Sequence, residues 1–251
     1  MVFLFKKKSI KYLIFGKRKI TGRNNSGKLV LYRRGGGHKK NFKIIDFNHY
    51  IWNIYGIILR FEYDSLRNIF ISLIIYGNGI FTYHLTIKKM RVGMLILTKD
   101  TKFLNIGYTT LVKNIKSGML INSIELELNQ GSKYIRSAGI FSKALTPIKT
   151  SCLIKLKSKE IILINKNCLV TFGILISNNI FQKKFKKASF FRYKGWRPIV
   201  RGVAMNPIDH PHGGGQGKTS GGRPSVDPWG IYTKGIKTRK KLISGKIYLK
   251  R

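Results

Sequence analysis

The stretch from Arg201 to Lys218 can form neither a regular helix nor a regular strand. Pro207 and Pro211 lack a backbone donor, and the run Gly213-Gly214-Gly215 has no side chains to pack. A long polar loop in a folded chain is usually functional or disordered, and its low content of Ser, Glu and Lys argues against disorder. Because glycine lets a backbone approach a ligand with its N–H groups free to donate, we expect this loop to lie against a ligand.

Positive charge is concentrated at the two ends of the chain. Residues 1–45 contain 14 basic residues and no acid, and residues 181–251 contain 18 basic residues and two acids, whereas residues 46–180 contain 17 and seven. The net charge of +40 would make an isolated globule repel itself, so it favours a polyanionic partner. A hydrophobic content of 43% excludes a simple disordered tail, and the middle is long enough for one or two small cores.

Short apolar runs separated by turns fill the middle of the chain. The runs 69–76 and 80–87 flank Gly77-Asn78-Gly79, which predicts a β-hairpin, and the runs 153–157 and 161–164 flank a second tight connection. Little helical periodicity is present, so small β-barrels or sandwiches are predicted, with a boundary near residue 115.

Cations alternate with aromatic residues and glycines at both ends of the chain. The segment 33–40 combines two arginines, two lysines and three glycines without an acid, and the segments 183–187 and 190–198 place Phe, Tyr and Trp beside Lys and Arg. Such segments offer phosphate partners and stacking faces for bases. We therefore expect residues 16–43 and 181–241 to carry tight binding to a nucleic acid.

Catalytic and metal-binding patterns are weak. The run Gly213 to Thr219 resembles a phosphate-binding P-loop, but His212 occupies the position of its first glycine, and prolines replace the expected strand. Asp209, His210 and His212 lack a fourth ligand for a tetrahedral metal ion. A hydrolase or phosphotransferase that uses Asp209, His210 and the glycine loop remains an alternative function.

The remaining polar candidates are interpreted as structural. Glu125 and Glu127 alternate with apolar residues, which predicts the solvated face of a strand, and His84 is expected to be a structural residue within a strand. Cys152 and Cys168 form no CxxC pair and are predicted to be reduced core thiols. No apolar run approaches the length of a membrane span, and the order of charged and apolar blocks in residues 1–15 is wrong for a secretory signal.

Specific motifs recur along nearly the whole chain from about Gly22. They are Gly22-Arg23-Asn24-Asn25, Arg34-Gly35-Gly36-Gly37-His38-Lys39, Ile45-Asp46-Phe47, Arg136-Ser137-Ala138-Gly139, the run from Arg197 to Gly215, Thr219-Ser220-Gly221-Gly222-Arg223-Pro224, Pro228-Trp229-Gly230 and Thr233-Lys234-Gly235. With these motifs the chain resembles the ribosomal large-subunit protein L-two family, and the run from Arg197 to Gly215 is the most specific of them.

The resemblance implies a mainly β fold: an oligonucleotide-binding-type barrel followed by an SH3-like barrel, with long basic irregular N- and C-terminal extensions. We assign residues 1–50 to a basic N-terminal arm, 51–115 to the first barrel, 116–195 to the second barrel and 196–251 to a basic Gly/Pro-rich extension. The resemblance further implies a structural, non-enzymatic protein that binds large-subunit ribosomal RNA. It also implies that the protein supports the peptidyl transferase centre, tRNA binding and subunit association. His210 matches a family histidine discussed in connection with peptide-bond formation.

Residues in both extensions and two residues of the second barrel are expected to contact ribosomal RNA. They are Arg23, Asn24, Asn25, Arg33, Arg34, Gly35, Gly36, Gly37, His38, Lys39, Lys40, Arg136, Lys194, Trp196, Arg197, Arg201, Asn206, Asp209, His210, His212, Gly213, Gly214, Gly215, Lys218, Arg223, Trp229, Lys234, Lys237 and Arg239. No catalytic or metal-binding residue is expected among them.

The resemblance also implies partners and a compartment. The expected partners are large-subunit ribosomal RNA, other large-subunit proteins, the small subunit across the subunit interface and nearby tRNA. No cofactor is expected, and Mg²⁺ is expected only through the bound RNA. The interior is rich in Ile, Asn, Lys and Phe, as in an AT-rich genome, which favours a mitochondrial ribosome over a plastid or bacterial one. A cationic protein of a membrane surface is a third alternative, but the sequence lacks a long amphipathic helix.

Overall fold

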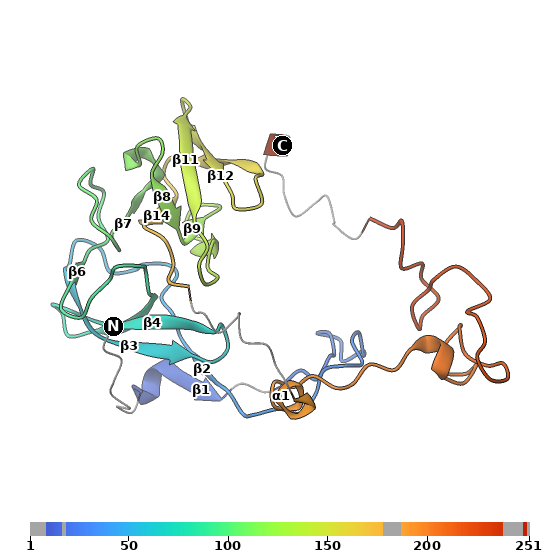
Figure 1. Cartoon of the computed structure of the whole chain (residues 1–251). Coiled ribbons are helices and arrows are strands. Elements are labelled where there is room, and N and C mark those ends of the chain that lie inside the picture. The colour runs from blue at the N-terminus through green and yellow to red at the C-terminus, as the bar shows by residue number, and fades with distance from the viewer. Residues whose placement is uncertain (1–8, 17–18, 178–186, 238–247, 250–251) are drawn as a thin grey trace. The chain divides into compact units, whose positions relative to one another are not determined.

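The computed structural model describes residues 9–16, 19–177, 187–237 and 248–249, and it consists mainly of short β-strands (Figure 1). The chain divides into two compact units. Unit 1 comprises Met1–Lys17, Lys39–Lys184 and Lys246–Arg251, and unit 2 comprises Arg18–His38 and Phe185–Gly245. The mainly β class predicted from the sequence is confirmed.

Two antiparallel sheets form most of unit 1. The four-stranded sheet has the order β5 (Phe81–Leu85), β4 (Ile69–Tyr76), β3 (Gly56–Asp64), β6 (Leu95–Ile96). The seven-stranded sheet has the order β15 (Tyr248–Leu249), β13 (Ile161–Asn165), β12 (Ser151–Lys155), β11 (Ser142–Pro147), β8 (Leu120–Asn122), β14 (Leu169–Phe172), β7 (Thr109–Leu111). These two curled sheets agree with the oligonucleotide-binding-type and SH3-like barrels that the resemblance implied.

The remaining helices and strands among the described residues are short. In unit 1 they are η1 (Lys11–Leu13), the pair β1 (Ile14–Gly16) and β2 (Asn41–Lys43), η2 (Val112–Asn114), and the pair β9 (Ile124–Glu125) and β10 (Ser132–Tyr134). In unit 2 they are α1 (Ala188–Tyr193) and η4 (Gly202–Ala204). Since β7 pairs with β14, the second sheet also uses residues that precede position 115.

The hairpin predicted around Gly77-Asn78-Gly79 is confirmed. Strands β4 and β5 pair from Ile75 with Phe81 to Ile71 with Leu85. The Gly79 N–H donates to the Tyr76 carbonyl at 2.9 Å, and Gly79 has a φ of +80°, which a side chain rarely permits. The second predicted hairpin is formed by β12 and β13.

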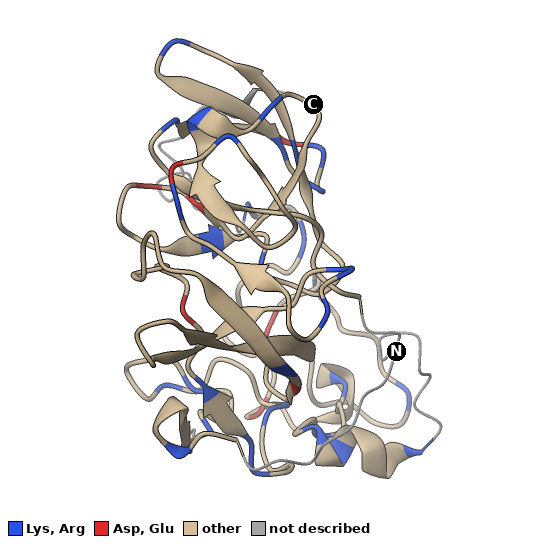
Figure 2. Cartoon of the chain, turned by 90° about the vertical axis from the view of Figure 1, so that its left-hand side faces the viewer, with Lys and Arg blue, Asp and Glu red and all other residues tan. Residues whose placement is uncertain are grey.

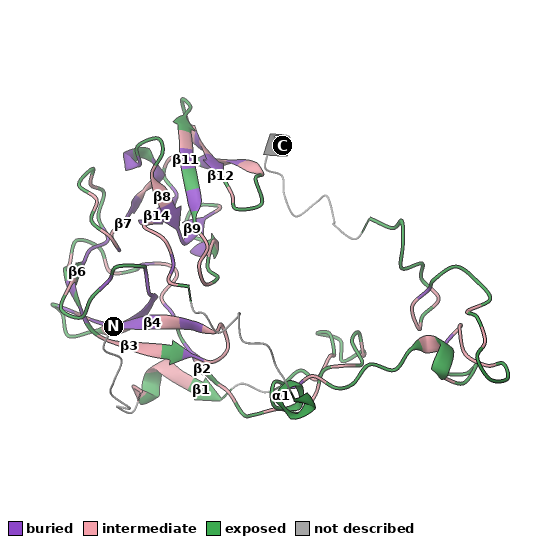
Figure 3. Ribbon diagram, viewed as in Figure 1, coloured by how far each residue is buried: buried purple, intermediate pink, exposed green. Residues whose placement is uncertain are grey.

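Each sheet of unit 1 encloses its own apolar core, and the strands that carry these cores contain buried stretches, drawn purple in Figure 3. Ile58, Ile71 and Ile74 are fully buried in the first core, and Ile121 and Ile154 in the second. Burying one such side chain contributes roughly 1.5–3 kcal/mol, so these two clusters are the main source of stability in unit 1. Both cysteines are free and buried, as predicted, and burial raises the pKa of the Cys152 thiol.

The prediction that Glu125 lies on a solvated face is wrong. Glu125 is only 2% exposed, and its carboxylate accepts the N–H of Gly131 at 3.0 Å and the N–H of Leu169 at 2.9 Å. One backbone donor from the turn between β9 and β10 and one from β14 converge on this carboxylate and compensate its burial. Glu127 is exposed, as expected.

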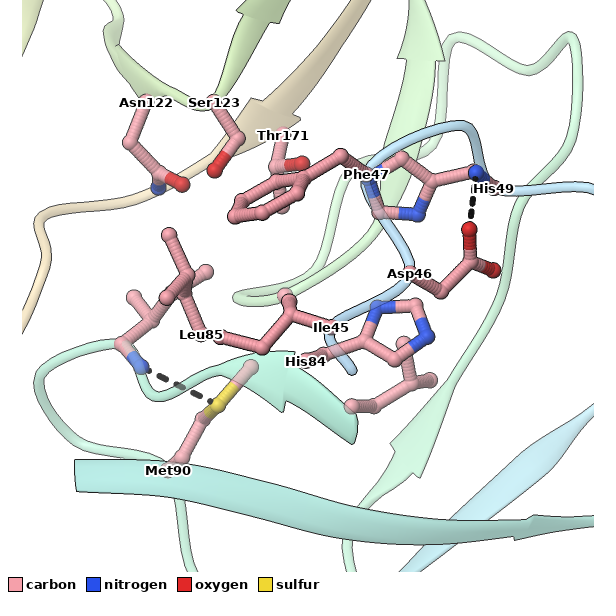
Figure 4. Close-up of a pocket in the computed structure, with 13 residues that line it drawn as sticks. Ile45, Asp46, Phe47, His49, His84, Leu85, Met90, Asn122, Ser123 and Thr171 are labelled. Atoms are coloured by element: carbon pink, nitrogen blue, oxygen red, sulfur yellow. Dashed lines mark hydrogen bonds between the residues drawn. The ribbon is translucent and has the colours of Figure 1, made fainter. Parts of the chain in front are cut away.

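A buried polar seam lies between the two cores of unit 1, where His49 and His84 face each other with ring centroids 5.0 Å apart (Figure 4). The His49 N–H donates to the Asp46 carboxylate at 2.8 Å, and His84 contacts the Tyr76 hydroxyl at 3.2 Å. His84 is therefore structural, as predicted. Burial, together with the nearby charge of His84, lowers the pKa of His49 to about 3, and burial also lowers the pKa of His84.

We expect the melting temperature to fall as the pH is lowered from 7 towards 4. The unfolded chain binds protons at both histidines below about pH 6.5, whereas folded His49 binds its proton only near pH 3, so acid favours unfolding. The loss is at most roughly 1.4 kcal/mol per pH unit for each histidine. His49→Asn suits the positive φ of 53° and should flatten this dependence in thermal unfolding measured at several pH values. An unchanged slope, equal to that of the exposed control His38→Asn, would contradict the assignment.

Candidate nucleic-acid interface

In unit 2 the backbone of the basic segment that begins at Arg33 is hydrogen-bonded to residues at the end of α1 and just after it. The Gly35 N–H donates to the Gly195 carbonyl, and the His38 N–H donates to the Tyr193 carbonyl, both at 3.0 Å. Gly37 has a φ of +79°, and a Cβ there would lie 2.6 Å from the Gly195 nitrogen. Gly37 therefore permits close backbone packing within the chain.

Aromatic rings in unit 2 are partly covered by the chain's own cations and rings. The Arg34 guanidinium lies 3.8 Å from the centroid of Trp196, and the Arg33 guanidinium lies 5.7 Å from it. Tyr32 stacks on Trp229 at 5.6 Å, and His38 stacks on Tyr193 at 4.7 Å. The two contacts with Trp196 hold the Arg33 and Arg34 guanidinium groups in position before any ligand binds.

Four arginines converge on one pocket of unit 2, which has a volume of about 430 Å³. Its basic lining residues are Arg23, Arg34, Arg192 and Arg197. No acidic residue lines the pocket, and none of these arginines forms an ion pair within the described part of the chain. Figure 2 illustrates how few acids the chain has to neutralise its cations. Four guanidiniums around a cavity, none of them in an ion pair among the described residues, are suited to phosphate groups.

Sequence reasoning missed Arg192 as a member of this pocket. Arg23, Arg34 and Arg197 were predicted to contact RNA, and the structure brings them together although 174 positions separate the first from the last. Arg192 lies in α1, and its guanidinium donates to the Trp196 carbonyl at 3.4 Å. The alternation of aromatic and basic residues at 190–198 was the pattern that could have identified it.

The stretch from Arg201 to Lys218, here called the Gly/Pro loop, is held in shape by hydrogen bonds within unit 2. The Asn206 carbonyl accepts the Asp209 N–H at 3.0 Å, and the Gly213 N–H donates to the His210 carbonyl at 2.8 Å. The Gly214 N–H then closes the loop on the Met205 carbonyl at 3.2 Å. Apart from η4, this stretch is irregular, as its prolines and glycines predicted.

His210 is a buried structural element of this loop. Its side chain is 8% exposed, and its Nδ1 atom accepts the His212 N–H at 3.0 Å. The ring packs so closely against Gly202 that a Cβ at position 202 would overlap it. His212 in turn lies near the Val226 N–H at 3.3 Å, and Asp209 is exposed without a hydrogen bond to either ring in the described structure. Among the described residues, no carboxylate is hydrogen-bonded to His210 to orient it as a general base.

Several other predicted RNA contacts are exposed in unit 2. Arg201, Lys218, Arg223, Lys234 and Lys237 are exposed, while Arg239 lies outside the described residues. The Asn24 carboxamide oxygen accepts the N–H groups of Ser26 and Lys28 at 3.0 Å, so this side chain stabilises a turn.

Arg136 lies in unit 1 and is joined there by a cation that sequence reasoning missed. The Arg136 guanidinium lies 4.8 Å from the centroid of Phe47, and the Arg67 guanidinium lies 5.7 Å from the same centroid. Burial and the nearby charge of Arg67 lower the pKa of Arg136. Asp64 binds Arg67 at 2.8 Å, which leaves a net positive charge at this place. No sequence pattern linked Arg67 to Arg136.

Metal and membrane features are absent from the part of the chain that the structure describes. No group of three or more His, Cys, Asp and Glu residues is arranged to hold a metal ion there. None of the described helices has the length and apolarity needed to cross a bilayer.

Two family models match the chain. "Ribosomal Proteins L2, RNA binding N-terminal domain" matches residues 10–98, and "Ribosomal Proteins L2, C-terminal domain" matches residues 105–230. The chain is 45% identical over 251 residues to the large ribosomal subunit protein uL2m of Reclinomonas americana, covering 99% of this chain and 90% of that protein. It is 40% identical over 248 residues to the large ribosomal subunit proteins uL2 of Rickettsia typhi and Orientia tsutsugamushi, covering 99% of this chain and 91% of each relative.

Proposed function

The chain belongs to the ribosomal protein L2 family of large-subunit structural proteins, and we propose that it binds large-subunit ribosomal RNA through the four-arginine pocket and the surrounding loops of unit 2. The family is structural rather than enzymatic, which agrees with the position of His210. The observation that carries the proposal is the pocket formed by Arg23, Arg34, Arg192 and Arg197 without an acid. Phosphates of a folded RNA supply the charge that this pocket lacks.

The Gly/Pro loop is the part of unit 2 that we propose to lie near the peptidyl transferase centre, where it supports tRNA binding and subunit association. Its internal hydrogen bonds give it a defined shape, which suits contact with a folded RNA surface. Other large-subunit proteins and the small subunit are the further partners of this proposal, and Mg²⁺ enters only as a counterion of the RNA.

We place the protein in the mitochondrial large subunit. The 45% identity to the uL2m of Reclinomonas americana and the AT-rich composition support this compartment, whereas the 40% identity to bacterial relatives leaves a plastid or bacterial ribosome as the alternative. Ribosomes purified from mitochondria, plastids and cytosol of the source cell, probed for this chain, would assign the compartment.

The tagged full-length protein should sediment with large ribosomal subunits after the subunits are separated at low Mg²⁺. Its excess of cations requires a polyanion, and ribosomal RNA is the polyanion of this family's assembly. Recovery at the top of the gradient would support the hydrolase or phosphotransferase alternative, and recovery with membranes would support the membrane-surface alternative. Either result would contradict the proposal.

Replacing His210 with glutamine should leave most of the peptidyl transfer rate intact. A glutamine carboxamide oxygen can still accept the His212 N–H, whereas His210→Leu leaves this partly buried donor unpaired, which costs up to about 1–3 kcal/mol. We therefore expect the leucine variant to be depleted from assembled subunits first. The measurement is the rate of the chemical step on purified, fully assembled variant subunits. A large rate loss for His210→Gln with normal assembly would restore a catalytic role.

A further inference from the structure

A groove of about 900 Å³ lies on unit 1, outside the arginine pocket. It is lined by Phe61 and by parts of three segments, 88–92, 139–141 and 174–177. Two of its lining residues, Met90 and Leu175, are also members of the first core. The base of the groove therefore belongs to the most stable part of unit 1.

Backbone hydrogen bonds hold the three segments together. The Lys88 N–H donates to the Ile174 carbonyl at 2.7 Å, and the Ile176 N–H donates to the Thr86 carbonyl at 3.0 Å. The Gly139 N–H donates to the Ile176 carbonyl at 3.1 Å. The groove is consequently a preformed feature of the fold.

The groove combines exposed apolar side chains with unpaired cations. Val92 is 59% exposed, Phe141 is 38% exposed, and Phe61 is half-buried. Lys88, Lys89 and Arg91 are exposed along the same lining, no acid lines the groove, and none of these cations forms an ion pair among the residues that the structure describes.

We propose that this groove seats an unpaired nucleotide of RNA, whose base packs on Phe61 and Phe141 while Lys88 and Arg91 bind the flanking phosphates. The inference rests on the proposed function, since that function supplies RNA as the partner. Aromatic faces beside cations are the combination with which proteins bind single-stranded bases. A volume of about 900 Å³ falls within the roughly 300–1,000 Å³ of typical ligand sites.

Charge complementarity favours RNA over a protein segment as the occupant. A protein segment would have to be apolar and also carry acids opposite three cations. An unpaired nucleotide supplies an apolar base face and negative charge in one unit. Lys89 also has a φ of +74°, a left-handed conformation that is uncommon outside glycine and that concentrates at binding sites.

The test uses the full chain and a uridine hexamer in which 4-thiouridine replaces the central base, with photo-crosslinks mapped by mass spectrometry. We expect crosslinks within residues 88–92 and at Phe141, in addition to crosslinks in unit 2. Phe141→Leu removes the aromatic face but keeps an apolar side chain, and it should raise the concentration for half-maximal crosslinking in the groove by about tenfold. Phe103→Leu is the matched control, because Phe103 is 88% exposed outside the groove, and it should leave the yield unchanged.

Three outcomes would overturn the groove assignment. The first is crosslinking in unit 2 with none in the groove, which leaves the proposed function intact. The second is equal competition by an abasic hexamer, which would mean that only phosphate is bound. The third is displacement of the hexamer from the groove by a Glu/Leu-rich peptide whose binding depends on Phe141, which would assign the groove to a protein partner. Absence of crosslinks from both units would instead contradict the proposed function.

Discussion

Replacing Arg23, Arg34, Arg192 and Arg197 together with glutamine should weaken RNA binding by on the order of a thousandfold at 0.1 M salt. Each arginine that neutralises a phosphate releases about 0.9 counterion from a duplex and about 0.7 from a single strand. The slope of log affinity against log salt should therefore become shallower by roughly 3–4 in the quadruple variant. The measurement is a titration of a large-subunit RNA fragment with the full chain at several salt concentrations.

A matched variant distinguishes the pocket from net charge. Replacing Lys99, Lys116, Lys155 and Lys157 with glutamine removes the same charge from exposed positions of unit 1, outside every pocket described above. We expect this variant to keep most of its affinity and nearly all of its salt slope. If both variants lose the same affinity, binding depends on total charge, and the four-arginine pocket has no special role.

The sequence predicted those features that depend on neighbouring residues. The β4–β5 hairpin followed from Asn78 and Gly79 between two apolar runs, because the turn chemistry is local. The irregular conformation of the Gly/Pro loop likewise followed from prolines and glycines in one short stretch. The barrel types were implied by the resemblance to a family, since strand periodicity alone does not specify how a sheet closes.

The features that sequence reasoning missed depend on contacts between distant residues. Glu125 fits the alternation of a half-exposed strand, but the N–H of Leu169, 44 positions away, stabilises it inside the protein. Arg67 and Arg136 share the ring of Phe47 only because the fold brings three separate segments together. Arg192 enters the arginine pocket in the same way. A pattern along the chain carries no information about such long-range contacts.

In the Gly/Pro loop the chain itself gives a physical reason for glycine at three neighbouring positions. The sequence suggested that Gly213, Gly214 and Gly215 pack against RNA, and RNA contact remains a prediction. The chain itself already excludes side chains there, because a Cβ at these positions would overlap the Asn206 carbonyl, the Pro207 ring and the Thr219 side chain, respectively. Gly214 and Gly215 also have φ values of +94° and +86°.

Replacing Gly213, Gly214 and Gly215 together with alanine should open this loop even in the absence of RNA. Each left-handed position costs about 1–2 kcal/mol for an alanine, and the overlap at Gly213 with a backbone carbonyl cannot be relieved by a rotamer change. We expect tryptic cleavage after the exposed Arg201 and Lys218 to accelerate at least tenfold, and incorporation into large subunits to fail. The control is alanine at Gly217, Gly222 and Gly230, which have positive φ but open space around them, so they carry the strain without the overlap.

A second substitution tests the overlap itself at one position. Thr219→Ser removes the methyl group that a Cβ at position 215 would meet, and it keeps the hydroxyl that donates to the Gly214 carbonyl at 3.1 Å. Adding Thr219→Ser to Gly215→Ala should therefore restore part of the protection from trypsin, whereas Thr219→Ser alone should change little. If the triple alanine variant resists trypsin and assembles normally, the glycines serve only as a flexible spacer. If only assembly fails while the loop stays protected, the surface that excludes a side chain belongs to the RNA rather than to the chain.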